Sequence, residues 1–165
     1  MSKRSPEITI RNAAAEDATA IHGLIHELAE TVGPAEKFRS TPSQYLRHGF
    51  SMEPMFEALV AESDDGLVGV VLYFYTFSSW RGEPGVYIQD LVVTEAARGH
   101  GLGEQLLREL VRVARERDVT HLRLAVDCNN KAAMRFYERR GLANIESDFI
   151  YEIEGDDFLR LGDVS

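Results

Sequence analysis

The sequence has little that would place the protein outside a reducing compartment or within a membrane. Cys128 is its single cysteine, so no disulfide can form within the chain, which suits the cytoplasm. No apolar run approaches the roughly 20 residues that span a bilayer, and the first residues lack the apolar core of a secretory signal. We therefore expect a cytoplasmic protein that has no membrane partner.

Basic side chains are also scarce, with 18 Lys and Arg against 27 Asp and Glu and a net charge of −9. This balance disfavours nucleic acid and anionic membrane surfaces as partners. The charge is uneven, because residues 98–140 hold 10 basic and 6 acidic side chains whereas residues 49–80 hold no Lys or Arg. A basic half could bind an anionic cofactor while an acidic half binds a cationic substrate, or both could be ordinary solvated surfaces; the sequence leaves both interpretations open.

A length of 165 residues fits one domain, and apolar residues make up an ordinary 44% of it. We predict a loose N-terminal leader over residues 1–6 and a single domain over 7–165. We find no internal repeat and no low-complexity linker.

Alternating and helical apolar patterns predict a mixed α/β sheet with helices on both faces. The predicted strands lie at 8–13, 58–62, 67–77, 86–93 and 121–127, and the alternation in the tail, 149–161, predicts a closing hairpin. The predicted helices begin near Asp17, at Thr41-Pro42, at Leu102 and at Ala132. Asp64-Asp65-Gly66 predicts a hairpin turn.

The strand–turn–helix segment 90–107 carries the strongest chemical signal. Gly99, Gly101 and Gly103 allow successive backbone N–H groups to converge just before a helix N-terminus, which is a binding site for phosphate. A dinucleotide-binding fingerprint would need a third glycine where Glu104 stands, and a Walker A loop would need Gly-Lys-Ser/Thr at the end. The spacing that fits is Arg98-x-x-Gly101-x-Gly103.

With this loop the sequence resembles the GNAT family of N-acetyltransferases, whose R/Q-x-x-G-x-G/A loop binds the pyrophosphate of acetyl coenzyme A. The resemblance covers nearly the whole chain and includes a later N-x-x-A-x-x-F-Y element, Asn130 to Tyr137. The runs YFYTFSSWRG, VYIQDLVV, RGHGLG, LRLAV and FYERRG are similar to the diamine and thialysine acetyltransferase branch. The resemblance implies a single-domain, mostly antiparallel sheet.

The resemblance also implies the coenzyme contacts. Backbone groups of a bulged strand and of the glycine loop, together with the later element, would bind acetyl coenzyme A as co-substrate, and no metal is expected. The residues so placed are Leu91, Val92, Val93, Arg98, Gly99, His100, Gly101, Leu102, Gly103, Glu104, Asn130, Ala133 and Tyr137.

Three residues are candidates for catalysis. Tyr137 matches the family's tyrosine near the sulfur, and a phenol has a suitable pKa for protonating a thiolate; alternatively it is a core aromatic of an amphipathic helix. Asp90 would accept a proton from the amine or hold the ammonium by charge, or it is only a strand-end residue with local hydrogen bonds. Gln89 stands where the diamine branch has glutamate, and it can neither act as a base nor pair with an ammonium.

The amine contacts are less defined. Trp80, Gln89, Asp90 and Arg123 are the substrate candidates; Arg123 could bind a carboxylate or simply face solvent, and Trp80 could cover the substrate or pack its own loop. Thr31 and Val32 stand where polyamine enzymes have polar and acidic contacts, which weakens the polyamine interpretation. Cys128 is predicted to be a bystander. His22 and His26 could ligate a metal, but with no third ligand in evidence we expect a solvated helix face.

We therefore expect a cytoplasmic N-acetyltransferase, in the acyltransferase class, that acetylates a primary amine of a small polyamine-like or lysine-like molecule by direct transfer in a ternary complex. A homodimer is expected from the resemblance. The alternatives are an acetyltransferase acting on a protein amine and a coenzyme A-binding sensor domain with little catalysis.

Overall fold

The computed structural model describes residues 7–33, 35–146 and 148–162. The predicted leader, residues 1–6, lies outside these ranges. The chain forms two compact units, residues 1–127 and residues 128–165, and each is described by itself.

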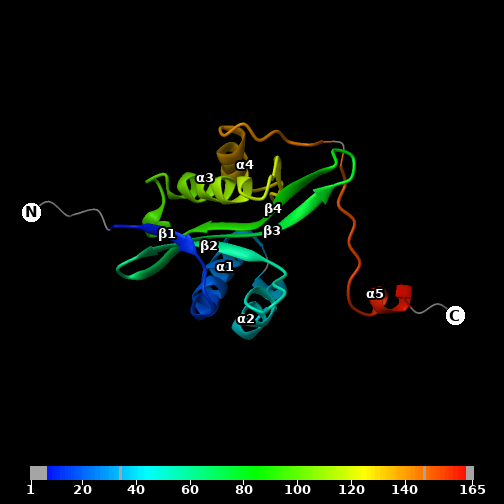
Figure 1. Cartoon of the computed structure of the whole chain (residues 1–165). Helices are drawn as coiled ribbons and strands as arrows, with labels where there is room; N and C mark the ends of the chain where they lie inside the picture. The colour runs from blue at the N-terminus through cyan, green and yellow to red at the C-terminus, as the bar shows by residue number, and fades with distance from the viewer. Residues whose placement is uncertain (1–6, 34, 147, 163–165) are drawn as a thin grey trace, which may run out of the picture. The chain divides into compact units, whose positions relative to one another are not determined.

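The first unit is built on one five-stranded sheet in the order β1-β2-β3-β4-β5 (Figure 1). The strands are β1 (Thr9–Asn12), β2 (Glu57–Ser63), β3 (Gly66–Ser78), β4 (Glu83–Val93) and β5 (His121–Leu124). Neighbouring strands are antiparallel except for β4 and β5, which are parallel. The sheet is therefore mixed and mostly antiparallel, as predicted.

Helices cover both faces of this sheet, which confirms the predicted α/β fold class (Figure 1). On one face lie α1 (Ala18–Val32) and α2 (Pro42–Gly49), and Ile21 and Leu24 of α1 pack on Val70 and Val92. On the other face lies α3 (Leu102–Arg115), whose leucines at every fourth position are buried. Short 3-10 turns at Ala15–Asp17, Ala35–Lys37 and Glu95–Ala97 lead into or out of these helices.

Local sequence accounts for the ends of these helices. Thr41 is the N-cap of α2, its amide donates to Gln44 Oε1 at 2.8 Å, and Pro42 occupies the first turn, where its missing N–H costs nothing. Gly33 ends α1, and Gly66, at φ +116°, closes the β2–β3 turn. These boundaries agree with the predicted ones within a few residues.

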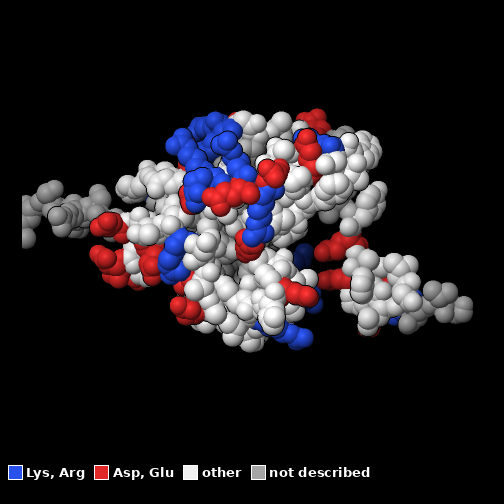
Figure 2. Space-filling view, in the orientation of Figure 1, with Lys and Arg blue, Asp and Glu red and all other residues white. Residues whose placement is uncertain are grey.

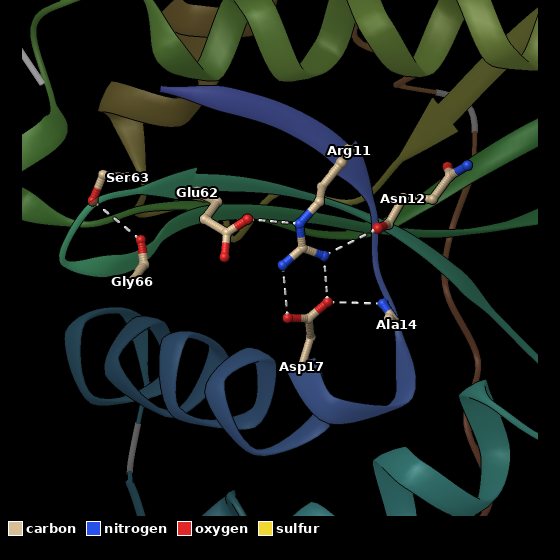
Figure 3. A network of polar contacts seen from close by, with 7 residues as sticks. All are labelled: Arg11, Asn12, Ala14, Asp17, Glu62, Ser63 and Gly66. Carbon is tan, nitrogen blue, oxygen red and sulfur yellow. Dashed lines mark hydrogen bonds and ion pairs between the residues drawn. The ribbon is translucent and has the colours of Figure 1, made fainter. Parts of the chain in front are cut away.

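Arg11 joins the edge of the sheet to the start of α1 (Figure 3). Its guanidinium donates to Asp17 Oδ2 at 2.6 Å and to Oδ1 at 3.0 Å, and its Nε donates to Glu62 Oε2 at 2.8 Å. Asp17 also accepts from the Ala14 amide at 2.7 Å, which fixes the turn before α1. Hydrogen bonding to Arg11 holds the pKa of the buried Asp17 carboxyl below its ordinary value.

Basic and acidic side chains lie side by side over α3 (Figure 2). Arg108 pairs with Glu104 at 2.5 Å, and Arg112 pairs with Glu109 at 2.8 Å and with Glu116 at 2.9 Å. The basic excess of residues 98–140 is thus partly neutralised by ion pairs on this helix, which favours an ordinary solvated face there. In the part of the chain that the structure describes, every helix is too short or too polar to cross a membrane.

The second unit contains α4 (Lys131–Glu138) and α5 (Gly155–Gly162). The closing hairpin predicted at 149–161 is wrong, because residues 149–154 form no regular secondary structure and the rest of the segment is α5. Phe149, Ile150 and Tyr151 are more than 80% exposed, so alternation without a paired strand and a covering core does not produce a strand. Two acidic residues after Gly155 favour a helix start instead.

Candidate active site

A β-bulge interrupts β4 in the middle of the candidate site. Leu72 of β3 pairs with Asp90, and the next residue, Tyr73, pairs with Ile88, so Gln89 is an extra residue in β4. Gln89 is exposed. The bulge also changes which face the next side chains take, because paired residues share a face of the sheet.

The two faces can be assigned from the packing. Leu72 belongs to the core cluster that α1 covers, so its partner Asp90 faces α1 and α2. Tyr73 lies on the opposite face, on the side of Gly69, where an added Cβ would meet Leu106 of α3 at 3.1 Å. Ile88, paired with Tyr73, therefore faces α3 although Asp90 is only two residues further along.

Just beyond the bulge, β4 and β5 separate. Their parallel pairing runs from Gly85–His121 to Ile88–Leu124, where β5 ends. The Thr94 amide donates to Val68 of β3 at 2.9 Å, so by strand alternation the Val92 amide also faces β3, while those of Leu91 and Val93 face the other edge. The Leu91 and Val93 amides thus lie along an edge that β5 does not pair, while the Val92 side chain is in the core.

The carboxyl of Asp90 has an altered acidity. Burial raises the pKa of Asp90 to about 6, because desolvation disfavours the charged form. Near neutral pH the group is therefore mostly ionised and still basic enough to accept a proton.

Tyr45 of α2 lies within electrostatic reach of Asp90, although no motif in the sequence predicts this proximity. Burial raises the pKa of the Tyr45 phenol, and the negative charge of Asp90 contributes to the increase. The Ser40 hydroxyl is buried near that phenol without the geometry of an ordinary hydrogen bond. A polar group from α2 is brought to β4 only by the packing of the two layers.

His22 and His26 form only a partly solvated face, and the His26 side chain remains 45% exposed. Both rings are half-buried and contact the Phe38 ring, with centroids 5.1 and 5.0 Å away, and His22 Nε2 lies 2.9 Å from the Ser40 carbonyl oxygen. The His22 ring also meets the Tyr45 ring edge-on at 5.4 Å. Among the side chains that the structure describes, no three His, Cys, Asp or Glu groups are placed to bind a metal ion.

The glycine loop has the backbone conformation that an anion site needs. Gly99 and Gly101 have φ of +81° and +76°, and a Cβ at either would meet no atom within 4 Å. Gly101 is the N-cap of α3 and offers no side chain to the first-turn amides of Leu102, Gly103 and Glu104. These amides and the positive end of the helix dipole fit a phosphate group.

Two side chains shape this loop without being buried in it. Arg98 Nε donates to the Val93 carbonyl at 3.0 Å, and His100 Nδ1 lies 2.9 Å from the Arg98 carbonyl oxygen. Arg98 thereby ties the loop to the end of β4.

The structure does not bring all the substrate candidates together. Trp80 is fully exposed at the β3–β4 turn, and six or seven residues of strand, about 20 Å, separate the start of β4 from Asp90. Arg123 is exposed on β5, opposite Tyr87.

The remaining candidates belong to the second unit. The Asn130 side chain is the N-cap of α4 and accepts from the Ala133 amide at 3.1 Å, a structural role that the motif did not reveal. Tyr137 is half-buried beside Phe136, with ring centroids 5.0 Å apart, and Cys128 is exposed.

Comparison with known proteins decides the family. The model of the acetyltransferase (GNAT) family matches residues 21–142. The chain belongs to the GNAT acetyltransferase family.

Relatives place this GNAT protein in the predicted branch. It is 32% identical over 160 residues to the thialysine N-epsilon-acetyltransferase of Bos taurus, and the match covers 90% of this chain and 94% of the relative. It is also 32% identical over 146 residues to the spermidine/spermine N(1)-acetyltransferase-like protein 1 of Homo sapiens, covering 84% of this chain. That match spans about a fifth, 21%, of the human protein. The GNAT protein is thus an N-acetyltransferase of the diamine acetyltransferase-like branch.

Solved structures support the fold. An integron cassette protein from the mobile metagenome of V. cholerae matches with a TM-score of 0.80 at 24% identity, over 95% of this chain and 98% of that one. An aminoglycoside N-acetyltransferase in complex with CoA matches with a TM-score of 0.72 at 15% identity, over 94% of this chain and all of the other. At these identities the likeness concerns the fold alone.

Proposed function

We propose that the GNAT protein transfers the acetyl group of acetyl coenzyme A directly to a primary amine of a small molecule while both substrates are bound. The observation that carries the proposal is that three structural features follow one another along β4 and the loop after it. The bulge at Gln89, the edge left open beyond Ile88 and the uncapped glycine loop before α3 follow one another within about 15 residues.

The proposed coenzyme contacts are made mainly by backbone amides. In our proposal the amides of Leu91 and Val93 bind the pantetheine and thioester end, and residues 98–104 bind the pyrophosphate. Acetyl coenzyme A supplies the acetyl group as a thioester. From the family resemblance we also assign Asn130, Ala133 and Tyr137 to the coenzyme, with Asn130 acting mainly by fixing the start of α4.

The proton transfers are assigned to two side chains. Asp90 accepts the proton that the ammonium must lose before its nitrogen can attack the thioester carbon, and its pKa of about 6 suits this role near neutral pH. The new C–N bond forms as the C–S bond breaks, and Tyr137 gives its proton to the departing thiolate. Gln89, exposed at the bulge, contacts the amine by hydrogen bonding rather than by charge.

The identity of the amine is proposed from the relatives. The names of two relatives specify thialysine and spermidine/spermine, which share an unhindered primary amine on a flexible chain. Arg123 would favour a substrate that also has a carboxylate, and we therefore place a lysine-like amine ahead of a polyamine. A role for Trp80 in the same site of one chain is disfavoured by its distance along β4.

Release of free thiol from acetyl coenzyme A tests the proposal directly. The panel contains thialysine, lysine, ornithine, spermidine, spermine, putrescine and a short basic peptide. We expect turnover with thialysine or lysine that falls when Arg123 is changed to Gln. Turnover of the peptide alone would support a protein amine as substrate, and thermal stabilisation by acetyl coenzyme A without any turnover would support a sensor.

The oligomeric state and the cellular location of the protein stay predictions. A homodimer and a cytoplasmic location rest on the family resemblance and on composition, and sedimentation and cell fractionation would test them.

A further inference from the structure

A cleft outside the candidate active site opens where β1 ends. It has a volume of about 450 Å³ and lies between the end of α2, the start of β2 and the end of α3. We call it the α2–α3 cleft. The residues that define it are Phe50, Phe56, Glu57, Val113, Glu116 and Arg117. Its volume is in the range of small-molecule sites in proteins.

One wall of the cleft is a polar network built on Glu57. Arg117 pairs with Glu57 Oε1 at 2.9 Å, and the buried Tyr73 hydroxyl donates to Glu57 Oε2 at 3.2 Å. The Arg117 guanidinium also lies 4.3 Å from the centre of the Tyr75 ring. These contacts hold Arg117 in place and neutralise its charge.

The charge that remains at the cleft is negative. Arg112 is shared between Glu109, at 2.8 Å, and Glu116, at 2.9 Å. Together with the Glu57–Arg117 pair, two guanidinium groups face three carboxylates. Among the charged residues that line the cleft itself, the two carboxylates of Glu57 and Glu116 outnumber the one guanidinium of Arg117.

The other walls are apolar. The Phe50 and Phe56 rings meet edge-on with centroids 6.4 Å apart, and Val113 of α3 also lines the cleft. An apolar body lying against these rings with a cationic end at Glu116 matches both parts of the lining.

The cleft is separate from the proposed acetyl-transfer site. Val113 and Arg117 lie at the opposite end of α3 from the glycine loop, about 20 Å away along the helix. Glu57 is on β2, two strands from β4, or about 10 Å from the bulge.

We propose that the α2–α3 cleft is a second binding site, which takes a small primary amine with an apolar, preferably aromatic, body. The apolar body lies against Phe50, Phe56 and Val113, and the ammonium group pairs with Glu116. The proposal does not depend on the proposed acetyl transfer, because it concerns other residues and is tested without a donor.

The test is a titration of the isotope-labelled full chain followed by amide NMR, with phenethylamine as the probe. Two matched probes, 3-phenylpropanoate and 2-phenylethanol, carry the same ring with a negative charge or none. We expect phenethylamine to shift amides in residues 12–13, 49–58 and 113–117 with saturation in the millimolar range. The other two probes should shift them at least about threefold less strongly, because they lack the charge.

Variants of α3 give the controls. Val113→Trp should fill the cleft and abolish these shifts, whereas Val111→Trp, on the exposed side of the same helix, should leave them unchanged. Glu116→Gln should weaken the binding of phenethylamine about threefold. Glu109→Gln also breaks an ion pair with Arg112, but Glu109 does not line the cleft, so the affinity should change less than about 1.5-fold. If Val113→Trp fails to fold, the Glu116 and Glu109 pair still decides the question.

Four results would overturn the proposal. Two concern phenethylamine alone: the absence of any shift, and shifts confined to residues 88–104. The other two are equal binding of all three probes and equal effects of Glu116→Gln and Glu109→Gln. None of these results decides whether acetyl transfer occurs, which thiol release measures separately.

Discussion

Ile88 and Asp90 are two residues apart on β4 and yet face opposite sides of the sheet. Ile88 pairs with Tyr73 on the α3 face, and Asp90 pairs with Leu72 on the α1 face, because Gln89 is inserted between them as a bulge. In a regular strand both would face α3. The bulge therefore directs the Asp90 carboxyl toward α1 and α2, where burial raises its pKa to about 6.

Replacing Asp90 by Asn should lower kcat by about 100-fold or more, because the site loses its proton acceptor. In the unchanged protein kcat/KM should fall as the pH drops below about 6, since protonated Asp90 cannot accept a proton, and Asp90→Asn should lose this limb of the profile. Asp118→Asn is the control, because Asp118 has φ +57°, which Asn tolerates well. An unchanged acidic limb in Asp90→Asn would assign the proton acceptor to another group.

Replacing Tyr137 by Phe should lower kcat by about 100-fold while the affinity for acetyl coenzyme A stays within about twofold. The reason is that the ring is kept and only the proton donor is lost. Tyr151→Phe, in the same unit and 92% exposed, is the control. Calorimetric affinity alongside steady-state rates checks the prediction, and a parallel loss of affinity and rate would contradict a proton-donor role.

Gly101→Ala should weaken acetyl coenzyme A binding and destabilise the fold by about 1 kcal/mol. The added Cβ meets no atom, but a residue with a side chain is strained at φ +76°. Gly23→Ala in α1 also meets no atom and has no such strain, so it should stabilise slightly. Thermal unfolding of the two variants separates conformational strain from crowding. Equal melting temperatures of the two variants would count against backbone strain at Gly101.

Asp17→Asn should cost about 2 kcal/mol at neutral pH through the lost charged hydrogen bonds to Arg11. Because the pKa of Asp17 is lower in the folded state, its contribution is present above its ordinary pKa and is lost as the pH falls through the lowered value. The difference between the two proteins in urea unfolding should therefore shrink toward strongly acidic pH. Glu16→Gln is the neighbouring control, and a pH-independent difference would contradict the mechanism.

Elements with strong local patterns were predictable. The leucines at 102, 106 and 110 specify the buried face of α3, and Thr41-Pro42 specifies the start of α2. The glycine loop was found for the same reason, since Gly99 and Gly101 are needed where φ is positive. The tail shows the limit of such patterns: Phe149, Ile150 and Tyr151 lie in a segment that alternates like a strand but forms none.

The sequence by itself determined the family, the α/β fold class and the glycine loop, because spacing of apolar residues and glycines acts over a few neighbouring residues. The tertiary structure decided what depends on residues far apart in the chain. The pairing of β3 with β4 created the bulge that turned Asp90 toward α1, and layer packing brought Tyr45 into its electrostatic reach. The contact of His22 with Phe38 likewise arises only where separate elements meet, and so does the α2–α3 cleft.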